Sequence, residues 1–343
     1  MIESVLAYRL RVTSRPVVIA HRGASGYRPE HSRAAYELAI ELGADAIEPD
    51  IVSSKDGVLV LRHENEISGT TDVASHRKFD DRRTTKVIDG VEQTGWFTED
   101  FTWEELSTLR AMERLPRIRR GSHTFIGGGG ILRLEDLLEL IDAASRPLIL
   151  VAEIKHATYF ASIGLDLGEL FAEQIAGWAT DDNLVVESFE PDVLEQIRGR
   201  GVPGKTVFQM EDHGAPADAI ARLGSSAMTY DDHLTDAGLA ALVGRVDGIS
   251  LDKTMILRAD AAGEVVGITD VVARAHSAGL LVYVYTLRAE NEFLAPNLRK
   301  GDSPASYGEW AREFALIYSS GVDGVFADQP DLALIAREAA PTS

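Results

Sequence analysis

Two carboxylates separated by a single residue interrupt an otherwise apolar run at residues 46–51, AIEPDI. Side chains alternate along a β-strand, so Glu48 and Asp50 are expected to project from one face. If that face is buried, each ionised carboxylate needs a positive partner, because an unpaired buried charge costs several kcal/mol or more. The alternative is an edge strand whose acidic face is simply hydrated.

Charged side chains also end three further apolar runs. They are His21 with Arg22, His63 with Glu64, and Glu153 with Lys155. The carboxyl ends of parallel barrel strands meet on one rim, where barrel enzymes carry their sites. We therefore expect these groups to share one cavity with the first pair of carboxylates.

Three carboxylates, Glu48, Asp50 and Glu153, are expected to line one wall of that cavity. Without a cation they would repel one another and be driven toward protonation. Oxygen donors alone suit Mg²⁺ or Ca²⁺ better than Zn²⁺, so we predict one divalent cation, Mg²⁺ or Ca²⁺, on this wall. The alternative is a salt-bridge cluster in which Lys155 and Arg22 alone neutralise the acids.

The chemistry predicted for this site is phosphoryl transfer to water. His21 and His63 are candidates for general base and general acid, because an imidazole pKa of about 6.5 allows either protonation state near neutrality. Arg22 and Lys155 are suited to an anionic substrate. The sequence has no G-x-x-x-x-G-K-[ST] loop, which disfavours a nucleoside triphosphate substrate. Structural roles are expected for the remaining histidines, which are His31, His76, His123, His156, His213, His233 and His276.

The elements that must position these residues alternate along the chain. Short apolar runs are followed by amphipathic patterns such as SRAAYELAIELG and PDVLEQIRGRG. This alternation predicts an α/β fold with a parallel sheet, and the number of units favours a closed TIM-type (β/α)8 barrel. The sequence offers nine candidate strands, one more than an eight-stranded barrel holds. One of them, at residues 57–63 or 247–252, must therefore pair irregularly.

Residues from 64 to about 130 interrupt the alternation of apolar runs and amphipathic patterns. They are polar, rich in turn residues and far longer than the ~2–6 residues usual for loops of α/β units. We predict a single catalytic domain over residues 1–343, with an inserted lobe at about 64–130 on the C-terminal rim, where long ordered loops shape substrate pockets.

Composition restricts the partners of the protein. Lys and Arg number 34 against 54 Asp and Glu, and the net charge of −20 argues against nucleic acid or an anionic membrane surface. There is no cysteine, which excludes disulfides and thiolate metal sites. Neither a signal peptide nor a membrane-spanning run is recognisable. These features predict a cytoplasmic protein with a small-molecule substrate, or a secreted one if a leader has been removed; the oligomeric state stays open.

The stretch AHRGASGYRPEHSRAAYELAIELGADAIEPDIVSSKDGVLVLRHENEISGTTDVA resembles the glycerophosphodiester phosphodiesterases. Their pattern of H-R-G, P-E-N-T, G-A-D, E-x-D, D-G, H-D and a later E-I-K is followed closely. The match continues through ESFEP, YTLRAEN and GVDGVFADQPDL, and IDGVEQTGWFTEDFTWEEL resembles the insertion of the longer bacterial type. The resemblance implies metal-dependent hydrolysis of glycerophosphodiesters to sn-glycerol 3-phosphate and an alcohol.

By residue, the resemblance implies three sets of roles. His21 and His63 are the acid/base pair, Glu48, Asp50 and Glu153 are the metal ligands, and Arg22 and Lys155 contact phosphate. Whether a substrate hydroxyl attacks phosphorus to give a cyclic intermediate, or water attacks directly, is left open.

The sequence departs from the family pattern at three places. P-E-N-T is replaced by PEHS, which keeps Glu30 as a candidate outer-shell residue behind the site. H-D becomes His63-Glu64, which puts the role of the acidic neighbour in doubt. A tryptophan common on a late strand is replaced by Tyr285, which with Phe189 is a candidate for the glycerol end of the pocket, plain core packing being the alternative.

Two other functions compete with this interpretation. One is a sphingomyelinase-like or lysophospholipase-D-like phosphodiesterase on the same barrel, against which the acidic composition argues. The other is a catalytically inactive module that binds a phosphodiester. Retention of both His21 and His63 argues against it.

Overall fold

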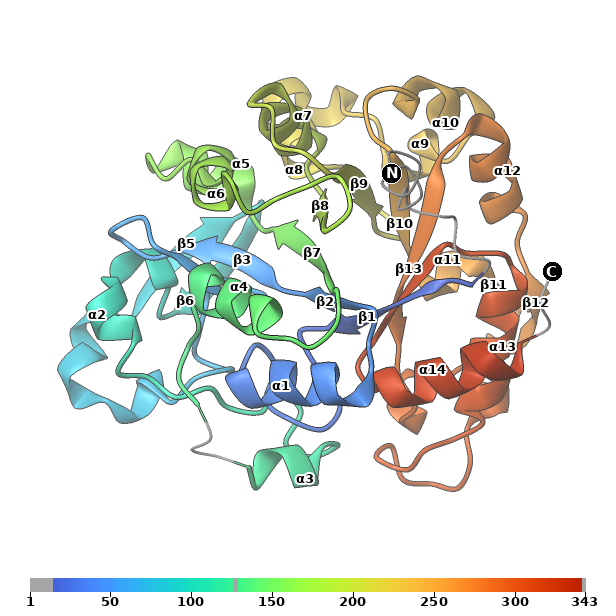
Figure 1. The fold of residues 1–343 in the computed structure, drawn as a ribbon, viewed down its shortest axis with the longest axis horizontal. Helices are drawn as coiled ribbons and strands as arrows, with labels where there is room; N and C mark the ends of the chain where they lie inside the picture. Colours follow the sequence, from blue (N-terminus) through green and yellow to red (C-terminus); the bar gives the residue numbers. More distant parts are fainter. Residues whose placement is uncertain (1–14, 126–128, 341–343) are drawn as a thin grey trace, which may run out of the picture.

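A closed barrel of parallel strands, covered on the outside by helices, forms the body of the molecule (Figure 1). The computed structural model describes residues 15–125 and 129–340. Around the barrel the strands are β1 (Val17–His21), β2 (Ala46–Glu48) with β3 (Asp50–Ser53), β7 (Ile149–Ile154), β8 (Leu184–Ser188), β9 (Lys205–Met210), β10 (Gly248–Asp252), β13 (Leu281–Leu287) and β14 (Gly324–Ala327). β14 pairs with β1 and closes the barrel, so the predicted (β/α)8 architecture is confirmed.

Helices follow the strands and pack on the outer face of the barrel. The α-helices outside residues 64–130 are α1 (Arg33–Leu42), α4 (Leu134–Asp142), α5 (Ala157–Ser162), α6 (Leu167–Ile175), α7 (Pro191–Gly199), α8 (Ala217–Leu223), α9 (Tyr230–His233), α10 (Asp236–Leu242), α11 (Lys253–Ile256), α12 (Val271–Ala278), α13 (Trp310–Ser319) and α14 (Pro330–Ala339). In the described ranges, no helix has both the length and the apolar character that crossing a bilayer requires. A short antiparallel pair, β11 (Leu257–Ala259) and β12 (Val265–Ile268), follows α11.

Local sequence explains where α1 begins and ends. The side chain of Ser32 accepts a hydrogen bond from the backbone N–H of Ala35, which caps the first turn. Gly43 ends the helix with a φ of 93°, a left-handed conformation that glycine adopts without the steric cost of a Cβ.

Two apolar layers hold the barrel together. The larger one lies between the sheet and the helices. The smaller one fills the barrel interior with Ile19, Ala46, Val151, Val185, Val207, Tyr283 and Phe326. This interior layer forms the floor of the barrel. Side chains of a strand face inward at every second position, so the next inward-facing residues above the floor are His21, Glu48, Glu153, Glu187, Gln209 and Tyr285. The strand period thus places a polar layer directly above an apolar one, toward the C-terminal rim.

One strand pairs irregularly. β4 (Leu59–Leu61) runs antiparallel to β3, with Leu61 opposite Ile51. The irregular strand therefore lies within residues 57–63, one of the two places predicted. The other place, residues 247–252, is wrong because it contains the regular parallel strand β10.

The prediction that His63 ends a parallel barrel strand is also wrong. β3 continues past the rim, the chain turns at Gly57, whose φ is 79°, and β4 returns toward the barrel. This hairpin, rather than a parallel strand, brings His63 to the site.

Most of the short elements in residues 64–125 lie beside β3 at the left of Figure 1, whereas the last helix, Arg120–His123, lies at the bottom below α1. These short elements are the 3₁₀ turns Val73–Ser75, Arg77–Arg82 and Thr98–Asp100, the strands β5 (Thr84–Ile88) and β6 (Val91–Gly95), and the helices α2 (Trp103–Leu106) and α3 (Arg120–His123). β5 and β6 form a hairpin closed by Asp89 and Gly90, both with positive φ, as a two-residue Asp-Gly turn requires. Further 3₁₀ turns occur at Gly224–Ser226, Asn291–Phe293 and Pro296–Leu298.

Candidate active site

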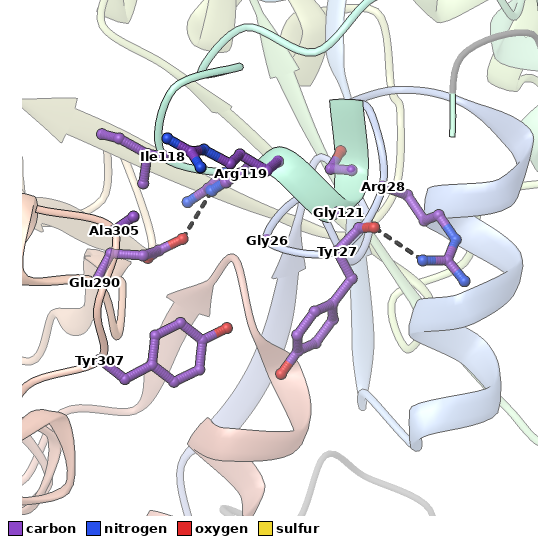
Figure 2. Close-up of a pocket in the computed structure, with 11 residues that line it drawn as sticks. Gly26, Tyr27, Arg28, Ile118, Arg119, Gly121, Glu290, Ala305 and Tyr307 are labelled. Atoms are coloured by element: carbon purple, nitrogen blue, oxygen red, sulfur yellow. Dashed lines mark hydrogen bonds and ion pairs between the residues drawn. The ribbon is translucent and has the colours of Figure 1, made fainter. Parts of the chain in front are cut away.

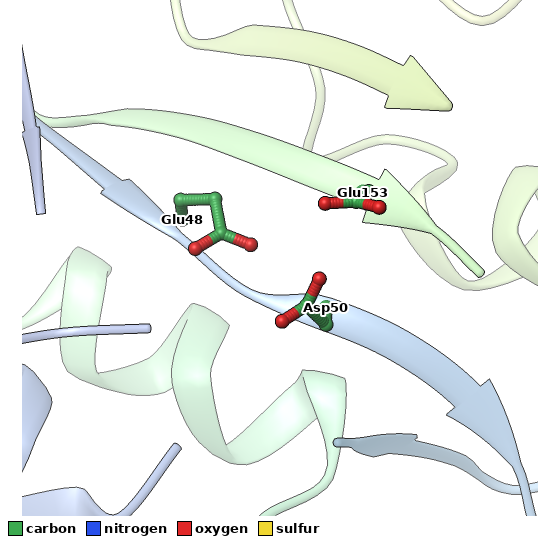
Figure 3. A group of neighbouring side chains, drawn as sticks. All are labelled: Glu48, Asp50 and Glu153. Atoms are coloured by element: carbon green, nitrogen blue, oxygen red, sulfur yellow. The ribbon is translucent and has the colours of Figure 1, made fainter. Parts of the chain in front are cut away.

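The acidic wall predicted from the sequence exists. Glu48, Asp50 and Glu153 each offer a carboxylate oxygen within 4.8 Å of the others, and all three side chains are buried. Asp50 lies opposite Glu153 in the pairing of β3 with β7. Figure 3 shows the three carboxyl groups turned toward the same space between these strands.

Two cations lie against this wall. Lys155 Nζ lies 2.5 Å from Glu153 Oε1 and 3.5 Å from Asp50 Oδ1. The Arg22 side chain approaches Asp50 Oδ2 at 3.1 Å, and its backbone N–H donates to Glu48 Oε2 at 2.7 Å. Part of the negative charge is therefore neutralised by the chain itself, as the salt-bridge alternative requires.

Two oxygen atoms of the wall still lack a hydrogen-bond donor. Glu48 Oε1 and Asp50 Oδ1 are buried and accept no hydrogen bond among the described residues. Burial, followed by the charges of Asp50 and Glu153, raises the pKa of Glu48 well above its usual value. Burial would also raise the pKa of Asp50, but Lys155 and Arg22 outweigh it and hold the pKa well below normal. Buried carboxylate oxygens that gather at one point without hydrogen-bond donors fit a hard divalent ion better than a closed salt-bridge cluster.

Glu187, which sequence reasoning missed, lies beside this wall. It is opposite Glu153 in the pairing of β7 with β8, is fully buried, and neither of its carboxylate oxygens has a hydrogen-bond partner among the described residues. Burial and the negative charges of Glu153 and Asp50 raise its pKa well above the usual value. Strand periodicity could have identified Glu187, because it lies two residues after Val185, which faces the barrel interior.

His21 is held by a second acidic residue that sequence reasoning missed, Asp328. The distance between His21 Nδ1 and Asp328 Oδ1 is 2.6 Å, and Arg119 and Arg288 donate to the other oxygen of Asp328. Burial, followed by the charge of Arg22, lowers the pKa of His21 to about 4. At neutral pH the imidazole is uncharged, donates from Nδ1 and keeps a lone pair on Nε2.

His63 is held in the same way by its neighbour in the sequence. Its Nδ1 lies 2.6 Å from Glu64 Oε1, and Arg114 binds both oxygens of Glu64 at 2.6–2.8 Å. Arg114 also binds both oxygens of Glu30 at 2.7–2.8 Å. Glu64, which replaces the aspartate of the family pattern, therefore links His63 to Arg114.

His31, for which a structural role is expected, is hydrogen-bonded to the acidic wall from behind. It is fully buried, and its Nε2 lies 2.9 Å from Asp50 Oδ2 while its Nδ1 lies 2.7 Å from the Tyr36 hydroxyl. It therefore orients one acid of the wall, at the very position where the sequence departs from P-E-N-T. His156 and His213, also expected to be structural, line the cavity.

The cavity above the wall has a volume of about 790 Å³. It is lined by eight predicted site residues: His21, Arg22, Glu48, His63, Glu153, Lys155, Phe189 and Tyr285. Of the other two, Asp50 is completely buried and Glu30 lies behind Arg22, with 3.2 Å between Arg22 Nη1 and Glu30 Oε2.

The outer part of the cavity mixes aromatic and acidic side chains. Phe189 and Tyr285 meet edge to face, with ring centroids 6.0 Å apart, and Lys155 Nζ lies 5.4 Å from the centre of the Phe189 ring. Asp89 reaches the cavity from the β5–β6 turn and lies 2.6 Å from Nδ1 of His156. The 64–130 segment thus contributes directly to the pocket wall.

A closed parallel barrel whose C-terminal ends gather buried carboxylates, paired imidazoles and cations in one cavity defines the class as a (β/α)8-barrel enzyme. The chain belongs to the glycerophosphoryl diester phosphodiesterase family, whose model matches residues 21–332. It is 33% identical to glycerophosphodiester phosphodiesterase GDPD6 of Arabidopsis thaliana over 342 residues, covering 92% of this chain and 84% of that protein. It is 29% identical to a probable glycerophosphodiester phosphodiesterase of Mycobacterium tuberculosis over 245 residues, covering 68% of this chain and 81% of that one. The resemblance inferred from the sequence motifs is confirmed.

Solved structures show the same fold. A glycerophosphoryl diester phosphodiesterase described for Silicibacter pomeroyi superposes with a TM-score of 0.65 at 19% identity, covering 95% of this chain and 94% of that one. An Oleispira antarctica phosphodiesterase in complex with the product sn-glycerol-3-phosphate superposes with a TM-score of 0.61 at 19% identity, covering 94% and 97%.

Proposed function

We propose that this enzyme hydrolyses glycerophosphodiesters to sn-glycerol 3-phosphate and an alcohol, with one divalent cation, Mg²⁺ or Ca²⁺. The observation that carries the proposal is the convergence of Glu48, Asp50 and Glu153, each with a carboxylate oxygen within 4.8 Å of the others, at the base of a cavity that two cations and two imidazoles also line. The solved relative bound to sn-glycerol-3-phosphate supports the choice of product.

Each group has a role that its surroundings allow. Glu48, Asp50 and Glu153 hold the cation, which offsets negative charge on the phosphate oxygens when bound. Arg22 and Lys155, both buried, bind the phosphate of the substrate. Glu30, behind Arg22, keeps that guanidinium in place.

His21 and His63 form the proton-transferring pair. Each has Nδ1 engaged by a carboxylate, from Asp328 and Glu64 respectively, so that Nε2 is the nitrogen available to the substrate. One imidazole, uncharged, takes the proton of the attacking hydroxyl on its Nε2. The other must enter the step protonated on both nitrogens, and it donates its Nε2 proton to the alkoxide that leaves phosphorus. The attacking hydroxyl belongs either to the substrate, which gives a cyclic intermediate, or to water.

The remaining expectations form part of the proposal. Phe189 and Tyr285 contact the glycerol end of the substrate. The catalytic unit is a single domain with an insertion at about 64–130, in a cytoplasmic protein that binds neither nucleic acid nor membrane stably. The ends of the 1–343 range and residues 126–128 lie outside the described residues.

The decisive experiment measures release of sn-glycerol 3-phosphate from choline, ethanolamine, glycerol and inositol diesters, with each divalent ion in turn. Asp50→Asn should reduce the rate by at least ~10²-fold because the ion loses a charged ligand, whereas Asp56→Asn, in the exposed turn between β3 and β4, should not. Failure to release sn-glycerol 3-phosphate from any diester, with activity on lipid vesicles instead, would favour the sphingomyelinase-like alternative.

A further inference from the structure

A second cavity, of about 410 Å³, lies apart from the acidic wall. It is formed where the segment after β1, the α3 region and the segment after β13 meet. Figure 2 shows Tyr27 and Tyr307 directing their hydroxyl groups toward each other on one side, with Glu290 and Arg119 on the other. None of the residues assigned above to the phosphodiesterase reaction lines it.

The charge of this cavity is opposite to that of the whole chain. Three arginines and a single carboxylate line it, although the net charge of the protein is −20. Arg119 is neutralised by Glu290 and Asp328. The Arg28 guanidinium donates to the backbone carbonyl of Tyr27 at 2.9 Å and lies 4.4 Å from the centre of the Phe125 ring, but neither it nor Arg120 forms an ion pair with a carboxylate of the described residues. Two guanidinium groups without a carboxylate partner in one concavity favour an anionic ligand.

The carboxylate in the cavity has an unused acceptor. The Glu290 side chain is 2% exposed, and its Oε1 accepts hydrogen bonds from Arg119 at 2.8 Å and from Gln329 at 2.9 Å. Its Oε2 has no partner among the described residues. A buried oxygen left without a donor costs about 1–3 kcal/mol, so a ligand hydroxyl that satisfies it gains affinity.

A chain of contacts joins this cavity to the proposed catalytic histidine. Arg119 binds Glu290 through Nε and Asp328 Oδ2 through Nη2. The other oxygen of Asp328 lies 2.6 Å from His21 Nδ1. A ligand that draws Glu290 toward itself would change how Arg119 is shared between the two carboxylates.

We propose that this cavity is a second binding site, for a small anion that also carries hydroxyl groups, of the polyol monophosphate class. Arg28 and Arg120 hold the phosphate, and Glu290 Oε2 accepts a hydroxyl. The choice of class rests on the proposed function, because the product of that reaction belongs to it. Through Arg119 and Asp328, occupancy of the site alters the support of His21.

Calorimetric titration of the full chain with sn-glycerol 3-phosphate in the presence of EDTA tests the site, since chelation removes the cation that the reaction site needs. We expect saturable binding that Arg120→Ala weakens roughly tenfold or more, the usual effect of losing a charged hydrogen bond. Arg117→Ala is the matched control, because Arg117 is exposed on the same segment and does not line the cavity. Absence of binding, or binding equal in both variants, overturns the proposal.

Two further arms separate the parts of the proposal. Inorganic phosphate and glycerol should each bind at least tenfold more weakly than sn-glycerol 3-phosphate, and equal binding of phosphate would overturn the role of Glu290.

With saturating diester and Mg²⁺, added sn-glycerol 3-phosphate should change kcat of the wild type but not of Arg120→Ala. An equal response of the two proteins overturns the coupling to His21. Because the binding arm needs no catalysis, failure of the proposed reaction leaves its result readable.

Discussion

Asp328, immediately after β14, and His21, at the end of β1, are 307 residues apart in sequence and 2.6 Å apart between Oδ1 and Nδ1. Burial opposes ionisation of Asp328, but Arg288 and Arg119 outweigh it and hold the pKa of the carboxyl well below normal. An ionised acceptor fixes the proton of His21 on Nδ1 and leaves Nε2 basic, the arrangement by which a carboxylate orients a catalytic histidine.

Asp328→Asn should lower kcat by roughly 10–100-fold or more, because the amide permits the wrong tautomer of His21. Asp331→Asn is the matched control, since Asp331 binds Tyr27 and does not contact His21. Nitrogen chemical shifts of the His21 ring report the tautomer independently of turnover. Wild-type kcat together with unchanged ring signals would show that Asp328 does not position His21.

His63→Ala should lower turnover by roughly 10²–10⁴-fold while the far-ultraviolet circular dichroism stays unchanged, because one proton-transferring group is removed from a partly exposed position. His76→Ala, in the same polar segment but outside the cavity, serves as control. If the two variants turn over at equal rates, His63 has no part in the reaction.

Arg114→Lys should lower kcat by roughly tenfold, because lysine cannot bind Glu30 and Glu64 bidentately and His63 then loses its support. The free energy of unfolding should fall by about 1–3 kcal/mol in urea titrations. Arg110→Lys, exposed on the same segment, should change neither quantity. Full activity of Arg114→Lys would show that the bidentate contacts of Arg114 do not support His63 in catalysis.

Added Mg²⁺ or Ca²⁺ should raise the melting temperature, because an ion that binds only the folded state stabilises it by mass action, by about 2.7 kcal/mol at 100 times Kd. Glu153→Gln should abolish the rise, whereas Glu92→Gln, exposed on β6, should keep it. A wild-type melting curve that is the same with ion and with chelator would contradict the assignment of the metal site.

Stability should depend on pH through Glu190, at the outer part of the cavity. Burial raises its pKa from 4.5 to about 7, the N–H of Thr158 opposes the shift, and the charges of Asp89 and Asp218 add to it. The folded state binds this proton more tightly than the unfolded state, so the associated stability is complete below about pH 4.5 and is lost as the pH rises through about 7.

Glu190→Gln should remove this dependence, because the amide does not titrate. Relative to wild type, its free energy of unfolding should rise by up to about 3 kcal/mol between pH 4.5 and pH 8. Glu173→Gln, exposed on α6, should follow the wild type at every pH in urea titrations. Parallel pH profiles for wild type and Glu190→Gln would mean that the pKa of Glu190 is the same in the folded and unfolded states.

The sequence by itself determined the barrel and the acidic wall. Alternation of apolar runs with amphipathic segments specifies parallel strands covered by helices, and a spacing of two residues puts Glu48 with Asp50, and Glu153 with Lys155, on inward faces. These rules are local, so they can be read from neighbouring residues alone.

Only the tertiary structure decided how the groups of the site are supported. Asp328 meets His21 because β14 closes the barrel against β1, and Arg114 contacts Glu30 from a position 84 residues later in the sequence. The return of β4 that delivers His63, and the contact of His31 with Asp50, depend likewise on where separate segments cross. Contacts between residues distant in sequence arise from closure and packing, and no local periodicity encodes them.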